Sequence, residues 1–182
     1  MRPLEILLLV LVLSGCAHSG ATGPCANPAP GVRYCLLPPN ALPADGEPRL
    51  VHVTGNELDQ HMISQVNVDT ARLTMIATNL LGQPLFEIRY KNSASGPTVS
   101  VFPADAPMEA AWLLALLQIA EADADEVRSG LRGSVLIEEG HSRRIERNGE
   151  TLVWIDKRNG RTEIHIPRQQ FRINIRTLTT HQ

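Results

Sequence analysis

The stretch RLTMIATNLLGQPLFEIRY, residues 72–90, decides the fold. Apolar and charged residues alternate from Leu85 to Tyr90, and a weaker alternation runs from Arg72 to Asn79. Because the alternation has a period of two residues, each strand has one apolar face and one polar face. This pattern is typical of an antiparallel sheet with one face in water. Leu80–Pro84 contains a glycine and a proline and predicts the turn between the two strands.

The same alternation extends outward from this stretch in both directions. It predicts further strands at residues 50–53, 62–68, 98–102, 134–138, 143–147, 150–156, 162–166 and 171–178. Asn148-Gly149 and Asn159-Gly160 are strong signals for two-residue hairpin turns, because both central positions of such turns favour Asn and Gly.

One long helix is expected from Pro107 to Ala122, because proline is favoured at the first helical position. Its apolar residues cover nearly all faces, so we expect apolar material on two sides of it. Asp123 is expected to cap a second, short helix that runs to Leu131.

The order of strands, helices and strands contains no βαβ alternation. We therefore predict a mainly β (α+β) domain at residues 49–182, a single curved antiparallel sheet or incomplete barrel with helices on the concave side.

The N-terminus has the pattern of a lipoprotein signal peptide over residues 1–15. An apolar run of eight residues, Ile6–Leu13, leads into Ser14-Gly15-Cys16, where the cysteine thiol is the expected lipidation site. The alternative is an uncleaved transmembrane helix, but this run is far shorter than the ~20 residues that span a bilayer. Cleavage removes Arg2 and Glu5 together, so the net charge of −2 does not change.

Residues 16–48 are expected to form the lipidated N-terminus and a Pro/Gly-rich tether, whose later part is expected to lie against the domain. Lipidation of Cys16 leaves Cys25 and Cys35 as one pair, and an oxidising periplasm favours a disulfide between them. The alternatives are two free thiols or a metal pair. A metal site would need more ligands than this pair, but no further cysteine and no histidine lies at a suitable spacing. No metal is therefore expected.

Charge and motifs exclude several classes of function. The small net charge argues against a nucleic-acid partner. Nucleophile-elbow, zinc-protease and phosphate-loop motifs are missing, so we expect neither an enzyme nor a cofactor. Three polar groupings are interpreted mainly as solvated surface: Glu138, Glu139 and His141; His52, Asp59 and His61; and the basic residues Arg143, Arg144, Arg147, Lys157, Arg158 and Arg161.

The segment Leu73–Gly82 resembles the Thr-Asn-Pro-Leu-Gly turn of the LolA/LolB-like lipoprotein class, to which the outer-membrane lipoprotein receptor belongs. The chain is most similar to small lipoproteins of that class often encoded with aryl-polyene biosynthesis genes. The resemblance implies an incomplete barrel around a cavity for acyl chains. It also implies a membrane-contact loop with Leu81 exposed at its tip, although Leu80 stands here in place of the proline. Ala17, the residue after the lipidated cysteine, resembles the sorting signal of lipoproteins that are directed to the outer membrane.

The concave side of the predicted sheet and the apolar helix supply eight candidate cavity-lining residues: Met75, Phe86, Ile88, Tyr90, Trp112, Leu116, Phe171 and Ile173. The alternative is that these residues pack tightly as core. With the resemblance, they imply a monomeric lipoprotein on the periplasmic face of the outer membrane. Its expected partners are the membrane, an acylated cargo (a lipoprotein or a lipid-like product) and a periplasmic carrier protein. The alternative function is a structural or assembly lipoprotein that binds a protein partner.

Overall fold

The computed structural model describes residues 23–43, 46–55, 57–91, 96–101 and 109–178. The signal peptide, Cys16 and Pro107 lie outside these ranges. The described part is mainly β with two α-helices, α2 (Ala110–Glu121) and α3 (Ala124–Gly130). Its larger sheet contains ten strands in the order β7-β6-β5-β4-β3-β13-β12-β11-β10-β9.

All pairings in the ten-stranded sheet are antiparallel, as the alternation predicted. The sheet is open, since β7 and β9 are its two edges and do not pair with each other. The strands are β3 (Arg49–Gly55), β4 (Leu58–Val68), β5 (Arg72–Thr78), β6 (Pro84–Lys91), β7 (Thr98–Val101), β9 (Val135–Glu139), β10 (Ser142–Arg147), β11 (Glu150–Arg158), β12 (Arg161–Ile166) and β13 (Phe171–Thr177).

The connections confirm the local signals in the sequence. Asn148 and Gly149 have φ angles of 54° and 78°, and Asn159 and Gly160 have φ angles of 51° and 70°. Two successive positive φ angles are those of a type I′ hairpin turn. A non-local pairing then joins the two ends of the domain, because β13 lies beside β3 with Ile173 opposite Val53.

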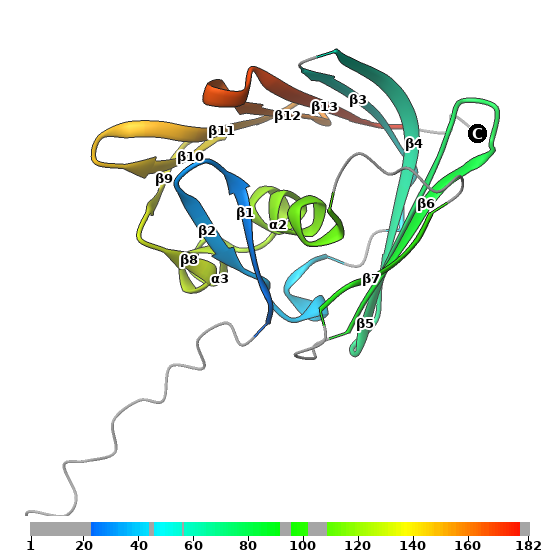
Figure 1. The fold of residues 1–182 in the computed structure, drawn as a ribbon, viewed down its shortest axis with the longest axis horizontal. Helices are drawn as coiled ribbons and strands as arrows, with labels where there is room; N and C mark the ends of the chain where they lie inside the picture. Colours follow the sequence, from blue (N-terminus) through cyan, green and yellow to red (C-terminus); the bar gives the residue numbers. More distant parts are fainter. Residues whose placement is uncertain (1–22, 44–45, 56, 92–95, 102–108, 179–182) are drawn as a thin grey trace, which may run out of the picture.

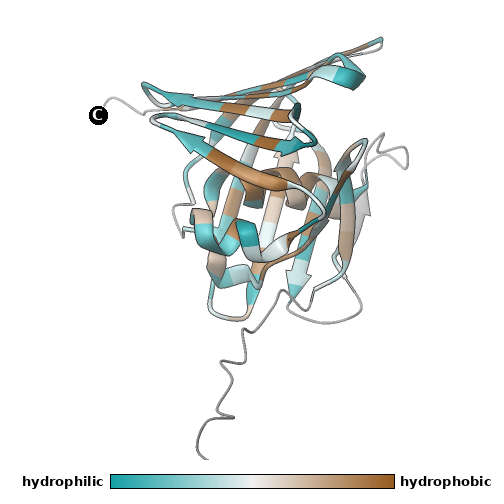
Figure 2. Ribbon diagram, turned by 90° about the vertical axis from the view of Figure 1, so that its left-hand side faces the viewer, coloured by the Kyte–Doolittle hydropathy of each residue, from teal (hydrophilic) through white to brown (hydrophobic). Residues whose placement is uncertain are grey.

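Helix α2 lies on the concave side of the ten-stranded sheet (Figure 1). The chain enters α3 through Asp123, whose side chain accepts a hydrogen bond of 3.0 Å from the Asp125 N–H, as the sequence predicted. Apolar and polar residues form alternating bands along the strands (Figure 2). The apolar positions face inward, and Val51, Val53 and Ile173 of the central strands are buried there.

A second sheet of three strands covers the other side of α2 (Figure 1). It consists of β1 (Cys25–Ala29), β2 (Val32–Cys35) and β8 (Leu131–Arg132). A short 3₁₀ turn follows at Pro39–Ala41, and another, Pro167–Gln169, precedes β13. Cys25 and Cys35 are register partners in the β1–β2 hairpin and form a disulfide, as expected.

This small sheet corrects part of the expectation for residues 16–48: the described residues from 23 onward form no free tether, whereas the later part packs against the domain as expected. The hairpin and the segment after it contribute buried side chains to the main core: Ala26, Ala29, Val32, Tyr34, Leu36, Leu37 and Leu42. The sequence did not reveal these two strands because they are only five and four residues long and lie in a Pro/Gly-rich segment. The folded domain thus begins well before residue 49.

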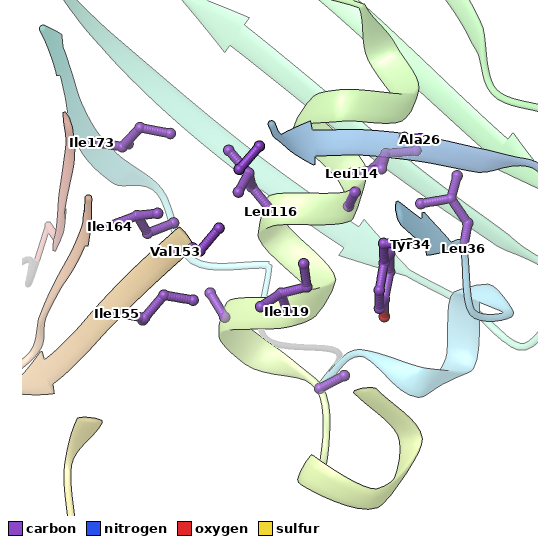
Figure 3. Packing of buried hydrophobic residues seen from close by; sticks show 14 of the residues in the cluster. Ala26, Tyr34, Leu36, Leu114, Leu116, Ile119, Val153, Ile155, Ile164 and Ile173 are labelled. Atoms are coloured by element: carbon purple, nitrogen blue, oxygen red, sulfur yellow. The ribbon is translucent and has the colours of Figure 1, made fainter. Parts of the chain in front are cut away.

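The packing around α2 explains why its sequence is apolar on nearly every face. Leu116 points toward Val153, Ile164 and Ile173 of the ten-stranded sheet, whereas Leu114 points toward Ala26 of β1 (Figure 3). The prediction that this helix has apolar material on two sides is therefore confirmed. Within the described ranges, no helix combines the length and the hydropathy needed to span a bilayer.

Candidate functional site

An apolar cleft lies between α2 and the concave face of the ten-stranded sheet. Its free volume is about 60 Å³. Two of its lining residues are polar, Arg49 and Ser64. The full lining comprises Arg49, Val51, Val53, Met62, Ser64, Val66, Met75, Phe86, Leu113, Leu116, Leu117, Ile164, Ile173 and Ile175.

Four of the eight predicted lining residues are in this cleft: Met75, Phe86, Leu116 and Ile173. The other four are elsewhere. Ile88 and Tyr90 are fully buried core residues, and Trp112 contacts Phe171 edge to face, with 5.2 Å between ring centroids. Sequence analysis missed the cleft residues of β3 and β4, although their alternation was visible in the sequence.

The N-terminal segment explains why Tyr90 does not line a cavity. A β-carbon added to Gly23 would lie 2.8 Å from the Tyr90 hydroxyl and would clash with the Leu36 carbonyl oxygen. Residues that were expected to form a tether therefore cover this end of the sheet. Burial raises the pKa of both Tyr90 and Tyr34, and their buried hydroxyls have no hydrogen-bond partner in the described structure.

Helix α2 is attached to the small-sheet side by one buried amide. The Leu37 N–H donates to Gln118 Oε1, and Gln118 Nε2 donates to the Leu37 carbonyl, both at 2.9 Å. Gln118 is fully buried, so these two bonds satisfy groups that have no access to water.

Two cations attach the C-terminal end of α2 to the large sheet. Arg143 Nη1 donates to the carbonyl oxygens of Ala122 (2.6 Å) and Ile119 (3.0 Å), and Lys157 Nζ donates to that of Ala120 (2.9 Å). Positive charge at this position complements the helix dipole. The interpretation of Arg143 and Lys157 as solvated surface was therefore wrong. A hairpin brings them to a helix end that is far away in the sequence.

These attachments all lie at one end of α2. Among the described residues, the side-chain hydrogen bonds given above involve its last turn, whereas Leu113, Leu116 and Leu117 meet the sheet through apolar contacts at the cleft.

A polar groove of about 240 Å³ adjoins the apolar cleft. Arg49 and Ile175 line both, so the two spaces meet at these residues. Arg49 and Lys157 both pair with Glu121, at 3.6 and 3.0 Å. Arg161 and Arg158 contribute further positive charge to this groove. The combination suits an amphiphile whose charged end lies beside its apolar part.

The turn between β5 and β6 exposes both leucines at its tip. Leu80 is 59% and Leu81 is 85% exposed, which agrees with the expectation that Leu81 is exposed at the tip. Asn79 Oδ1 accepts hydrogen bonds from the Leu81 and Gln83 N–H groups, at 3.0 and 2.9 Å. These bonds define the turn although it has no proline at position 80.

The polar groupings fall into two types. Glu138 pairs with Arg143 and Glu139 with Arg144, so these carboxylates do not converge on His141. His52, Asp59 and His61, in contrast, are brought together on β3 and β4, with ligand-type atoms all within 4.8 Å of one another.

A search of curated proteins finds no significant relative. A model of the family described as "Protein of unknown function (DUF3261)" matches residues 48–179, which is most of the chain and includes the whole ten-stranded sheet. The match does not connect the chain to the LolA/LolB-like class. It does establish that the chain belongs to the DUF3261 family of proteins of unknown function.

Proposed function

We propose that this protein is a LolA/LolB-like lipoprotein of the outer membrane. In this proposal Cys16 carries the lipid anchor, and the domain faces the periplasm as a monomer. The cleft between α2 and the large sheet takes up acyl chains of a lipoprotein or a lipid-like product during its transfer. The observation that carries the proposal is the cleft itself, whose lining is almost wholly apolar and comes from both α2 and the concave sheet face.

The cleft must widen to admit a chain, because ligand pockets usually have ~300–1,000 Å³ and the free volume here is about 60 Å³. In this proposal the cleft widens by movement of the N-terminal half of α2 away from the large sheet. Gln118, Arg143 and Lys157 attach the helix at its other end, so this end acts as the pivot.

Energetically, uptake resembles partition between two apolar environments. Each CH₂ group removed from water contributes ~0.8 kcal/mol in a protein cleft or in a membrane. Transfer between a carrier protein, this protein and the bilayer therefore needs only small differences in affinity. The charged end of the cargo would lie in the groove beside Arg49 and Arg161, where the apolar cleft meets positive charge.

The exposed pair Leu80 and Leu81 is the proposed contact with the acceptor membrane. Two adjacent leucines on a defined turn can enter the headgroup region without disturbing the core. This role supports transfer of the cargo from a periplasmic carrier protein to the outer membrane.

A fluorescent fatty-acyl probe tests the cleft. The protein produced from residue 17 onward is titrated with the probe, alongside Leu117→Trp and Ile76→Trp. Leu117 lines the cleft, whereas Ile76 is exposed on the opposite face of β5 from Met75. We expect saturable binding that Leu117→Trp weakens at least about tenfold and Ile76→Trp leaves unchanged. No saturable binding to the folded protein would refute the proposal.

A vesicle assay tests the turn. Leu81→Glu is expected to reduce transfer of a bound acyl probe to vesicles without reducing probe binding, because the leucine lies outside the cleft. Val135→Glu is the matched control, since Val135 is also exposed (59%) but lies on β9. Equal loss of transfer in both variants would argue against a specific membrane contact at Leu81.

A second candidate is a structural or assembly lipoprotein that binds a protein partner. The observation that favours it is the edge strand β9, which among the described strands pairs with β10 alone and exposes Val135. Such an edge can accept a strand from another chain. This candidate predicts that Val135→Glu impairs partner capture, that Leu117→Trp has no effect on function, and that acyl probes do not bind.

A further inference from the structure

Two histidines lie directly opposite each other on the convex face of the large sheet. His52 of β3 and His61 of β4 are register partners. The neighbours of His52, Val51 and Val53, are buried in the core. Because successive side chains of a strand point to opposite faces, His52 and His61 point away from the apolar cleft.

Asp59 completes the group. Its Oδ1 lies 2.7 Å from His52 Nε2. The two imidazole rings stack with centroids 3.9 Å apart and an interplanar angle of 10°. The three side chains therefore present two imidazoles and one carboxylate from a single pair of hydrogen-bonded strands.

We propose that His52, Asp59 and His61 bind a divalent transition-metal ion such as Zn²⁺. Imidazole nitrogen with carboxylate oxygen is a ligand set suited to Zn²⁺, Cu²⁺ and Ni²⁺, whereas Mg²⁺ and Ca²⁺ prefer oxygen alone. Each residue supplies one ligand atom, and water completes the coordination. This inference is independent of the proposed acyl-chain function, because the cluster and the cleft occupy opposite faces of the sheet.

The distances require only small side-chain adjustments. The three ligand atoms lie within 4.8 Å of one another. Around tetrahedral Zn²⁺, with bonds of ~2.0–2.1 Å, neighbouring ligand atoms are ~3.3 Å apart. The Asp59 and His52 side chains are 76% and 32% exposed, so both have room to rotate. The β3–β4 ladder fixes the backbone beneath them, which is the preorganisation that a metal site needs.

The cluster lies near the exposed turn of the same sheet. Ile63 is paired with Thr78, the last residue of β5. His61 precedes Ile63 by two residues, so it lies toward the sheet end from which the β5–β6 turn projects. A bound cation would thus add positive charge on the side of the molecule that carries Leu80 and Leu81.

The test measures Zn²⁺ binding by the full mature chain, purified without a tag in nonionic detergent. Isothermal titration calorimetry compares the wild type with His52→Ala, His61→Ala and Asp59→Asn. His141→Ala is the matched control, because His141 is exposed in the β9–β10 turn and its side chain belongs to no ligand cluster among the described residues. Circular dichroism and thermal unfolding verify that each variant remains folded.

We expect one Zn²⁺ per chain. Loss of either histidine should weaken binding by at least the ~10–100-fold that removal of a supporting residue costs in metal sites. Asp59→Asn should weaken it less, and His141→Ala should not change it. Absorption spectra of the Co²⁺-loaded protein should lack thiolate charge-transfer bands. The inference is overturned if folded wild type shows no saturable binding, or if His52→Ala and His61→Ala bind as tightly as wild type. The acyl-probe titration is scored separately, so either proposal can fail alone.

Discussion

The two sides of helix α2 are packed to different densities. Toward the small sheet, Leu114 is fully buried and Gln118 makes two hydrogen bonds to Leu37. Toward the large sheet, Leu113 and Leu117 are only half-buried and border a cleft of about 60 Å³. One helix thus separates a closely packed layer from a layer that leaves space.

This difference indicates which side of the helix contributes more to stability. A closely packed interface loses contacts when any atom is removed, whereas residues at a cleft already lack some neighbours. The small-sheet side should therefore carry more of the free energy of unfolding, and the cleft side should tolerate change. The following variants test this comparison in order of decreasing expected effect.

Truncation of leucines on the two sides gives the sharpest contrast. Leu114→Ala should lower the free energy of unfolding by about 3–4 kcal/mol, as expected for a fully buried leucine. Leu117→Ala should cost about 1 kcal/mol, because its side chain already borders free space. Urea unfolding followed by circular dichroism measures both. Equal costs would contradict the difference in packing.

Replacement of the buried amide should come next. Gln118→Met preserves the size of the side chain but leaves the Leu37 N–H and carbonyl without partners. We expect a loss of about 3 kcal/mol, since each buried unsatisfied group costs ~1–3 kcal/mol. Gln65→Met is the control, because Gln65 is exposed and its side chain donates to the Gly46 carbonyl at the surface. A loss as small as that of the control would mean that solvent reaches Leu37.

Reduction of the Cys25–Cys35 disulfide should destabilise the small-sheet side by about 2–3 kcal/mol, the loop-entropy value for a separation of ten residues. Urea unfolding of the Cys25→Ser/Cys35→Ser double variant measures this loss of stability. Acyl-probe binding should persist in conditions where this variant is folded, since neither cysteine lines the cleft. Loss of probe binding by a folded double variant would link the two sides of α2.

Arg143→Met tests the attachment of α2 to the large sheet. Loss of a charged donor to the Ile119 and Ala122 carbonyls should cost about 2 kcal/mol. Arg147→Met is the control on the same strand, because Arg147 is exposed. The fluorescence of Trp112 reports whether the helix shifts. If the C-terminal end is the pivot of α2, Arg143→Met should also change the kinetics of probe uptake in stopped-flow fluorescence.

The smallest effect is expected at Tyr34, whose buried hydroxyl has no hydrogen-bond partner among the described residues. Tyr34→Phe removes the cost of burying that group and should stabilise the protein by up to about 1 kcal/mol in thermal or urea unfolding. A loss of stability would reveal a bound water at this hydroxyl.

Local signals in the sequence correctly located most strands and turns. Asn148-Gly149 and Asn159-Gly160 determine type I′ turns because both positions tolerate positive φ. Asp123 caps α3 with its own side chain, which is also a local interaction. Of the candidate site residues, Met75, Phe86, Leu116 and Ile173 border the cleft.

Two of the three missed features are non-local. Tyr90 has the same alternation as Phe86 but lies beneath the segment around Gly23 and Leu36, which its own strand does not encode. Arg143 looks like any strand arginine until β10 is placed beside the end of α2. The hairpin Cys25–Cys35 was hidden by short strands in a proline-rich context.

The sequence by itself determined the antiparallel strands, their hairpin turns, the apolar helix and the pairing of the two cysteines. Each of these depends on periodicity or chemistry within a short stretch of chain. Tertiary structure alone decided that β13 pairs with β3, that the N-terminal hairpin fills one side of α2, and that a small cleft remains on the other. The physical reason is that these contacts join residues far apart in the sequence, where burial of apolar surface and not local preference selects the partner.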